Sequence, residues 1–225
     1  MSTYISAADS NTSEWLTAVL RQSGVLKLGK VSAVEKEMTG AFNSHLSRLL
    51  LQYSADAAPG VPTRLILKQN IQAAWGIEAG ADEVKFYNVV ASLQDHPSVI
   101  VPCYAAAYDE QSGNSYVLLQ DLSETHQPPL TRAQQISIVE GIPLTEYIEA
   151  VVDTLARLHA YWWNHPLLET HTFDVGYWSR NAERFEQYLR RRKSAWETLL
   201  AHHGAWFPDD FRELYEQVLV HLSQH

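Results

Sequence analysis

The sequence predicts an α+β protein in which five antiparallel strands and one inserted helix are followed by a segment that is helical throughout. Three observations support this prediction. Residues 31–122 contain five short runs that favour strands and are separated by turn residues. Within this region, apolar residues repeat at helical spacing only at 81–94. After residue 131, the apolar residues recur with the spacing of amphipathic helices.

Composition limits the classes of protein to which the chain can belong. With 225 residues it can form one large domain or two lobes of about 100 residues each, with a real apolar core. The net charge of −9 argues against nucleic acid as the main partner, since phosphate backbones are bound by surplus Lys and Arg. Cys103 is the only cysteine, which excludes an internal disulfide and a cysteine-based zinc site.

The sequence also lacks the features of an exported or membrane-spanning protein. Its first twenty residues have no basic head followed by an apolar run, and nowhere do 18 apolar residues occur together. We therefore expect a cytoplasmic protein with no membrane partner and a small ligand.

The first predicted element is a helix at residues 14–24. Ser13 is its expected cap and Gly24 its expected end. The spacing of its large apolar residues places them on one buried face: Trp15, Leu16, Val19 and Leu20.

Three strands are expected next. Residues 31–38 and 45–54 favour strands and flank the glycine turn TGAFNS at 39–44, which predicts a hairpin. A third strand follows at 63–68 after a loop with two prolines. Consecutive strands joined by short turns form an antiparallel meander.

A helix and two further strands complete the predicted sheet region. The helix is expected at 81–94 and to end before Pro97. The two strands are expected at 101–109 and 115–122, joined by the turn residues at 112–114. The helical spacing at 81–94 is carried by four residues: Val84, Tyr87, Val90 and Leu93.

The character of the chain changes at residues 123–131, a polar stretch with two prolines that is typical of a linker. We therefore expect an N-terminal lobe at 1–122 and the beginning of a helical lobe at 132–225. Helical repeats in that second part occupy three segments: residues 144–164, 177–202 and 208–223.

Lys68 stands at the end of an apolar strand, where a charge needs a partner. The three aliphatic residues before it are consecutive, which is typical of a strand covered on both faces. Glu83, 15 residues further on, lies in the first turns of the next helix and is the candidate counter-ion. Two simpler interpretations remain open. Lys68 would protect an edge strand, or Glu83 would only add favourable charge at a helix N-terminus.

A strand that ends in lysine and is followed by a helix with a glutamate resembles the arrangement by which protein-kinase-like folds aim a lysine at ATP phosphates. More narrowly, the chain resembles the aminoglycoside phosphotransferase and choline kinase superfamily, in its ecdysteroid-kinase-like branch. The resemblance covers about residues 25–165. Five segments carry it in order: TGAFNSHLSRLLLQY, RLILKQN, EVKFYNVV, YVLLQDLSE and LARLHAYWW.

The resemblance implies roles for residues on the phosphate side of a nucleotide site. Lys68 would contact the phosphates of ATP, and Glu83 would orient Lys68. The turn before the second strand would cover the phosphates, with Asn43 and the Ser44 hydroxyl near the phosphate oxygens. Asn43 and Ser44 are also ordinary turn residues, and that interpretation stays open.

On the adenine side, the resemblance makes the segment VLLQDLSE the hinge between the lobes. The main chain of Asp121, Leu122 and Ser123 would hydrogen-bond adenine. Leu118 and Leu119 would help to form the apolar slot for the base.

The family also has a His-Gly-Asp catalytic loop and, after it, an acidic motif that binds Mg²⁺. Neither motif occurs here, since the pair His203 and Gly204 is followed by Ala205. The resemblance therefore places the catalytic and metal-binding residues beyond His225, and none of them within these residues. The 225 residues would then catalyse nothing by themselves.

The sequence thus favours an ATP- and Mg²⁺-dependent phosphotransferase that acts on a hydroxyl group of a small molecule. A non-catalytic, kinase-like binding module is the alternative. If helices from residue 144 onward lack their usual neighbours, an apolar surface of the helical lobe would be left open and favour self-association.

Overall fold

The computed structural model describes most of the chain. The described residues are 12–39, 43–93, 95–131, 134, 144–170 and 182–222. The chain divides into two compact units, Met1–Phe173 and Asp174–His225. The segment expected to separate two lobes, 123–131, lies inside the first unit, and that division into lobes stays a prediction.

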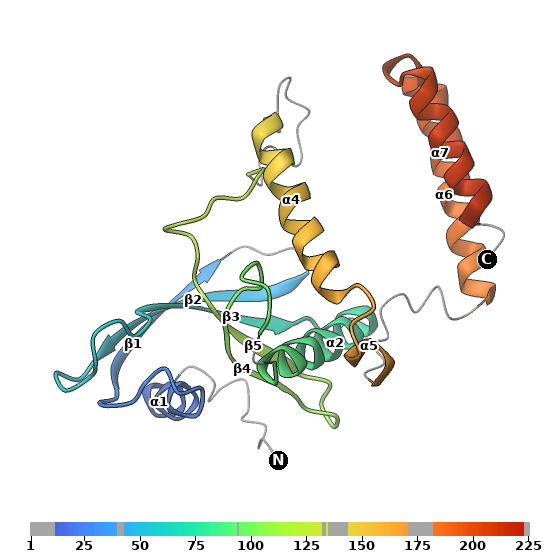
Figure 1. Cartoon of the computed structure of the whole chain (residues 1–225). Helices are drawn as coiled ribbons and strands as arrows, with labels where there is room; N and C mark the ends of the chain where they lie inside the picture. The colour runs from blue at the N-terminus through green and yellow to red at the C-terminus, as the bar shows by residue number, and fades with distance from the viewer. Residues whose placement is uncertain are drawn as a thin grey trace. The chain divides into compact units, whose positions relative to one another are not determined.

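The first unit is built on a five-stranded antiparallel sheet (Figure 1). Its strands are β1 (Val31–Thr39), β2 (Ser44–Tyr53), β3 (Arg64–Asn70), β4 (Cys103–Tyr108) and β5 (Ser115–Gln120). They lie in the order β1-β2-β3-β5-β4. The predicted α+β class and the predicted five-stranded antiparallel sheet are confirmed, and each predicted strand end lies within two residues of the observed one.

Helix α1 (Ser13–Gln22) covers one face of this sheet. Its cap is Thr12 rather than the predicted Ser13, because the Thr12 hydroxyl oxygen accepts a hydrogen bond from the Trp15 N–H at 3.2 Å. The four predicted apolar residues of the helix are all buried. They pack against fully buried leucines from three strands: Leu49, Leu65, Leu67 and Leu118.

Helix α2 (Ala74–Ala91) lies against the opposite face, beside β3, β4 and β5. It begins seven residues before the predicted start at residue 81. The added turns contain Gly76 and Gly80, and glycine is a poor helix former, so local preference does not reveal them. Both glycines are buried.

Helix α4 (Thr145–Trp162) and the short α5 (Leu167–Thr170) end the first unit. The Trp162 ring lies 6.2 Å from the ring of Phe86 on α2, and the Tyr161 hydroxyl donates to the Asp95 carbonyl oxygen. No residue of α4 is buried. Large apolar residues that are 44–59% exposed lie at its N-cap and along its first three turns: Leu144, Ile148, Val151, Val152 and Leu155. The self-association expected from such a surface stays a prediction.

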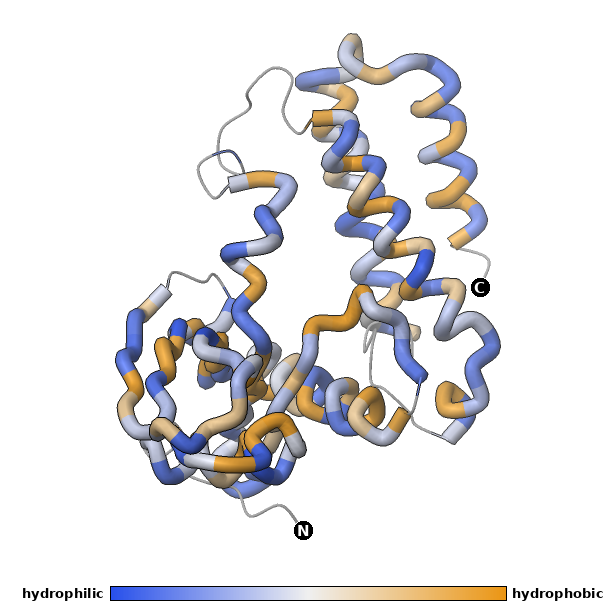
Figure 2. Tube along the Cα trace, turned by 60° about the vertical axis from the view of Figure 1, so that its left-hand side comes forward, coloured by the Kyte–Doolittle hydropathy of each residue, from blue (hydrophilic) through white to orange (hydrophobic). Residues whose placement is uncertain are grey.

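The second unit is a helical hairpin of α6 (Ala182–His203), a 3₁₀ turn (Gly204–Trp206) and α7 (Asp209–Leu222). Trp196 of α6 is 6% exposed and contacts aromatic rings at the turn and on α7. Figure 2 shows hydrophobic residues interspersed with hydrophilic ones along the helices. In the described part of the chain, no helix is both long and apolar enough to cross a membrane.

Candidate functional site

Lys68 and Glu83 form an ion pair between β3 and α2. The Lys68 Nζ donates to the Glu83 Oε1 at 2.7 Å. Their side chains are 34% and 29% exposed, so both charges remain accessible to a ligand. The pairing predicted from the sequence is confirmed. Both simpler interpretations are wrong, because β3 lies between β2 and β5 and is no edge strand, and because α2 begins at Ala74, so that Glu83 is not at the helix N-terminus.

Two glycines explain how a glutamate can reach the sheet from α2. Gly76 and Gly80 are four residues apart on one face of the helix, where Gly76 lies close to Ile71, just after β3, and Gly80 lies close to the sheet. A Cβ atom on Gly80 would overlap the Ser115 hydroxyl and lie 2.9 Å from the Asn70 Cβ. Since Glu83 follows Gly80 by three residues, the close approach at Gly80 brings its carboxylate to Lys68.

A pocket of about 170 Å³ opens beside this ion pair. It is formed by the start of β2, the C-terminal end of β3, the start of β5 and helix α2. Its polar side chains are Asn43, Ser44, Lys68, Asn70, Glu83 and Ser115. The structure thus brings together the four residues predicted for the phosphate side of the site. Gly40, the glycine of the predicted covering turn, lies outside the described residues.

Asn70 is a pocket residue that the sequence did not reveal. Its Nδ2 donates to the Gly113 carbonyl oxygen at 2.9 Å, and its Oδ1 accepts from the Ser115 N–H at 2.7 Å. These bonds fix the end of β3 to the turn between β4 and β5. The available signal was its position two residues after Lys68, since alternate residues of a strand lie on one face.

The two leucines predicted for the adenine slot lie on opposite faces of the sheet. Leu119 is paired with Ile66, which shares its face with Lys68. Leu118 is paired with Leu67 and is fully buried against α1. The prediction for Leu118 is therefore wrong, because consecutive residues of a strand point in opposite directions.

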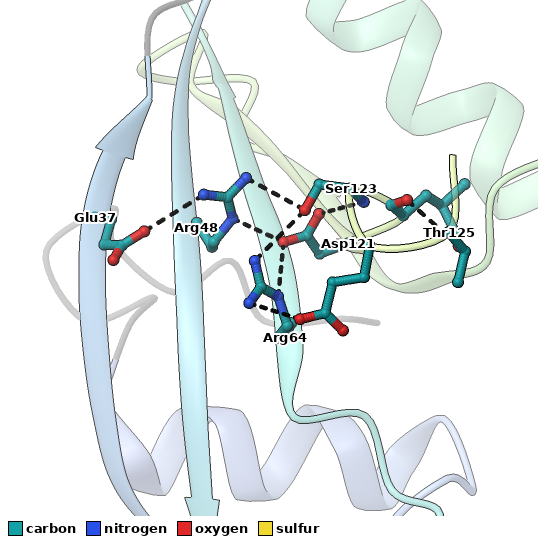
Figure 3. A network of polar contacts seen from close by, with 8 residues as sticks. Glu37, Arg48, Arg64, Asp121, Ser123 and Thr125 are labelled. Carbon is teal, nitrogen blue, oxygen red and sulfur yellow. Dashed lines mark hydrogen bonds and ion pairs between the residues drawn. The ribbon is translucent and has the colours of Figure 1, made fainter. Parts of the chain in front are cut away.

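The side chain of Asp121, just after β5, lies in a network of charges (Figure 3). Its carboxylate is only 3% exposed and accepts hydrogen bonds from Arg48 Nε at 2.8 Å and Arg64 Nε at 3.4 Å. The Ser123 N–H donates to the same carboxylate at 2.9 Å. Arg48 also pairs with Glu37 at 3.4 Å, so the network joins three neighbouring strands to the segment after β5.

Several main-chain groups expected to bond adenine already have partners within the protein. The Asp121 N–H donates to the Arg64 carbonyl oxygen at 3.3 Å. The Leu122 carbonyl oxygen accepts from Thr125 and His126, at 3.0 and 2.8 Å. The Ser123 N–H is bonded to the Asp121 carboxylate. An adenine that used these groups would have to replace internal hydrogen bonds, and the adenine role of Asp121, Leu122 and Ser123 stays a prediction.

We expect the Asp121 network to make stability depend on pH. Burial raises the pKa of Asp121, but hydrogen bonds from Ser123 and Arg48 lower it more, so the pKa lies below its ordinary value. A carboxylate with a lowered pKa stabilises the fold above its unfolded-state pKa, and this contribution is lost as the pH falls through the folded-state pKa. Asp121→Asn should lower the free energy of unfolding by about 1–3 kcal/mol at neutral pH.

The measurement is urea unfolding of the parent chain and Asp121→Asn at pH 7 and pH 3, where the difference between them should shrink. Glu124→Gln is the control, since Glu124 contacts Arg64 at 2.9 Å but is 66% exposed. An equal difference at both pH values would contradict the assigned role of the Asp121 charge.

The described residues offer no evident metal site. In that part of the chain, no three or more His, Cys, Asp or Glu side chains gather in a group that could hold a metal. The pocket beside Lys68 contains one carboxylate among its described residues, Glu83, which is bonded to Lys68.

Comparisons of the chain with protein-family models, with curated proteins and with solved structures gave no match. The functional inference therefore depends on the geometry of the site and on the chemistry of its residues.

Proposed function

We propose that the pocket at Lys68 binds the phosphates of ATP, and that the chain belongs to an ATP-dependent phosphotransferase that acts on a hydroxyl group of a small molecule. The observation that carries this proposal is the 2.7 Å contact between Lys68 on the third strand and Glu83 on the following helix. Protein kinases use a lysine and a glutamate from these two elements to orient the phosphates of ATP. A protein-kinase-like fold is part of the same proposal.

The charges and polar groups of the pocket suit a phosphate. The Lys68 ammonium group supplies positive charge, and its contact with Glu83 restricts its direction. Ser44, Asn70 and Ser115 add side chains that can donate hydrogen bonds. Hydrogen bonds between charged groups are stronger than those between neutral ones, so Lys68 contributes the largest share of the binding.

The size of the pocket indicates where the rest of a nucleotide would lie. Its volume of about 170 Å³ is below the lower limit of about 300 Å³ for sites that enclose a whole drug-sized ligand. Only the phosphates would enter it. The base would lie on the face of the sheet that carries Lys68, next to Ile66 and Leu119, which are paired and only half-buried.

The described residues do not supply a ligand set for Mg²⁺. Magnesium prefers carboxylate and phosphate oxygens, and the single carboxylate of the pocket is bonded to Lys68. A non-catalytic module that binds nucleotide is the second candidate function. The reading frame beyond His225 distinguishes the two: a His-Gly-Asp loop followed by an acidic motif would favour the enzyme, and a stop codon directly after His225 would favour the module.

The proposal predicts that Lys68→Ala weakens binding of ATP with Mg²⁺ by about tenfold to a hundredfold. A hydrogen bond to a charged group contributes about 1.5–3 kcal/mol, which corresponds to that range. Isothermal titration calorimetry measures the affinity. The control is Lys36→Ala, since Lys36 is an exposed lysine on β1 and pairs with Leu49, which faces α1. Equal affinities for the parent chain and Lys68→Ala would overturn the proposed site.

A further inference from the structure

We infer that the free edge of β4 is a docking site for an extended peptide segment of another protein, which would add a sixth strand to the sheet. This site is separate from the pocket at Lys68 and does not depend on the proposed function. The inference rests on the hydrogen-bonding groups of the strand, on its side chains and on the cavities beside it.

The strand order leaves β4 with one unpaired edge. Among the described residues, β4 pairs only with β5. The Asp109 N–H, just after β4, donates to the Asn114 carbonyl oxygen at 2.8 Å, so it points toward β5. The backbone groups of a strand alternate in direction, so Ala107 and Ala105 also face β5. The N–H and C=O groups of Ala106 and Tyr108 therefore point to the free edge.

The two edges of the sheet differ in how they resist pairing with other strands. Exposed charged residues discourage such pairing, and β1 carries three in succession, Glu35, Lys36 and Glu37. In contrast, β4 has the sequence CYAAAY, with no charged residue and no proline. The β4 edge thus keeps its hydrogen-bonding groups available and has no side chain that would repel an incoming strand.

Two cavities lie end to end along this edge. One, of about 530 Å³, is formed by Ala106–Tyr108 and by α2 residues that include Val84 and Val89. The other, of about 510 Å³, is formed by Cys103–Ala106, by α2 and by residues of α1 that include Val19 and Gln22. Ala106 belongs to both cavities. Beside Cys103–Ala106 the edge therefore lies in a groove between α1 and α2, and beside Ala107 and Tyr108 the groove continues along α2 alone.

This recess determines what can occupy the edge. Pairing of two copies through β4 would bring α2 of each copy, and α1 at the Cys103 end, against the other copy, so a second copy fits this edge less well than a single extended segment. A single extended segment has the required shape, and its backbone supplies the complementary N–H and C=O groups. The small side chains of Ala105, Ala106 and Ala107 leave room for larger residues on that segment. Where the segment faces α2, the cavity is lined by Val84 and Val89 and also by Lys85 and Asn88, so it accepts a segment in which apolar and polar side chains alternate.

The test uses the full chain, labelled with ¹⁵N, and a capped probe peptide, acetyl-Thr-Val-Thr-Val-Thr-Val-amide. The peptide alternates polar and aliphatic residues and favours an extended conformation. We expect saturable shifts of the β4 amide signals. Hydrogen exchange of the Ala106 and Tyr108 amides should slow at least tenfold, while that of the Ala107 amide, already bonded to β5, should change little. The absence of this slowing would overturn the inference.

Two controls distinguish pairing of the peptide backbone with β4 from non-specific binding of the peptide through its side chains. The same peptide methylated at every backbone nitrogen keeps its side chains but has no N–H donors, so it should not bind. On the protein, Ala106→Pro removes an N–H that does not bond to β5 and should weaken peptide binding at least tenfold, whereas Ala106→Ser should not. If Ala106→Pro fails to fold, the methylated peptide decides. Equal binding of both peptides, or dimerisation through β4 without peptide, would contradict the inference.

Discussion

Replacing Leu118 by alanine is expected to lower the free energy of unfolding by about 2–5 kcal/mol, the cost of removing a fully buried leucine from a core. Leu118 is 0% exposed and packs in the cluster that joins α1 to the sheet. The same substitution at Leu119 should cost less stability, because Leu119 is only half-buried on the opposite face. Chemical denaturation, monitored by circular dichroism, measures the free energy of unfolding of both variants.

For nucleotide binding we expect the opposite order, with the larger effect at Leu119. Leu119 shares its face with Lys68, so Leu119→Ala should weaken ATP binding by about threefold to tenfold through the loss of apolar contact. Leu118→Ala should leave the affinity of the folded fraction unchanged. Leu118→Ala and Leu119→Ala are therefore matched controls for each other. A loss of ATP affinity in Leu118→Ala alone would show that the assignment of the two faces to core and ligand is wrong.

Replacing Gly80 by valine is the second change with a large expected effect, a loss of about 1–3 kcal/mol in the free energy of unfolding. A side chain at this position meets Ser115 and Asn70, and overpacking of a close contact costs about 1–3 kcal/mol. Valine is a slightly better helix former than glycine, so this cost comes from the close contact and not from helix propensity. If α2 moves away from the sheet to relieve the contact, Glu83 moves away from Lys68. ATP binding should then weaken as well.

Glu78→Val is the control for a valine on the same helix away from the sheet, since Glu78 is exposed. It introduces the same side chain without contact to the sheet, and should cost less than about 1 kcal/mol. Stability and ATP affinity are measured for both variants. Equal losses for Gly80→Val and Glu78→Val would mean that the close approach at Gly80 does not hold α2 in place.

The sequence predicted the ion pair because its evidence is local. A buried strand that ends in Lys68 requires a counter-ion, and Glu83 lies on the next element in the chain, so few partners had to be considered. The strands were predicted for a similar reason, since each is bounded by turn residues in the sequence. In both cases the deciding interactions lie within a short stretch of chain.

The remaining features depend on pairing between distant segments. Arg48 and Arg64 meet Asp121 across 73 and 57 residues, and only the register of β2 and β3 brings them together. Asn70 is fixed by Gly113 and Ser115, more than 40 residues further on. No local pattern reveals such contacts.

Two of the corrections have simpler causes. Leu118 was assigned to the ligand side together with Leu119, although the alternation of a strand separates them. The start of α2 was missed because its first turns contain two glycines, which allow the helix to lie close to Ile71 and to the sheet but are poor helix formers.

The most direct test of the central claim uses an ATP analogue with a reactive acyl phosphate, which transfers its acyl group to a lysine beside the bound phosphates. Mass spectrometry then identifies the modified lysine. We predict modification of Lys68, prevented by excess ATP with Mg²⁺ and absent in Lys68→Ala, with little modification of the exposed Lys36. Modification spread over exposed lysines, with none at Lys68 and no protection by ATP, would contradict the account.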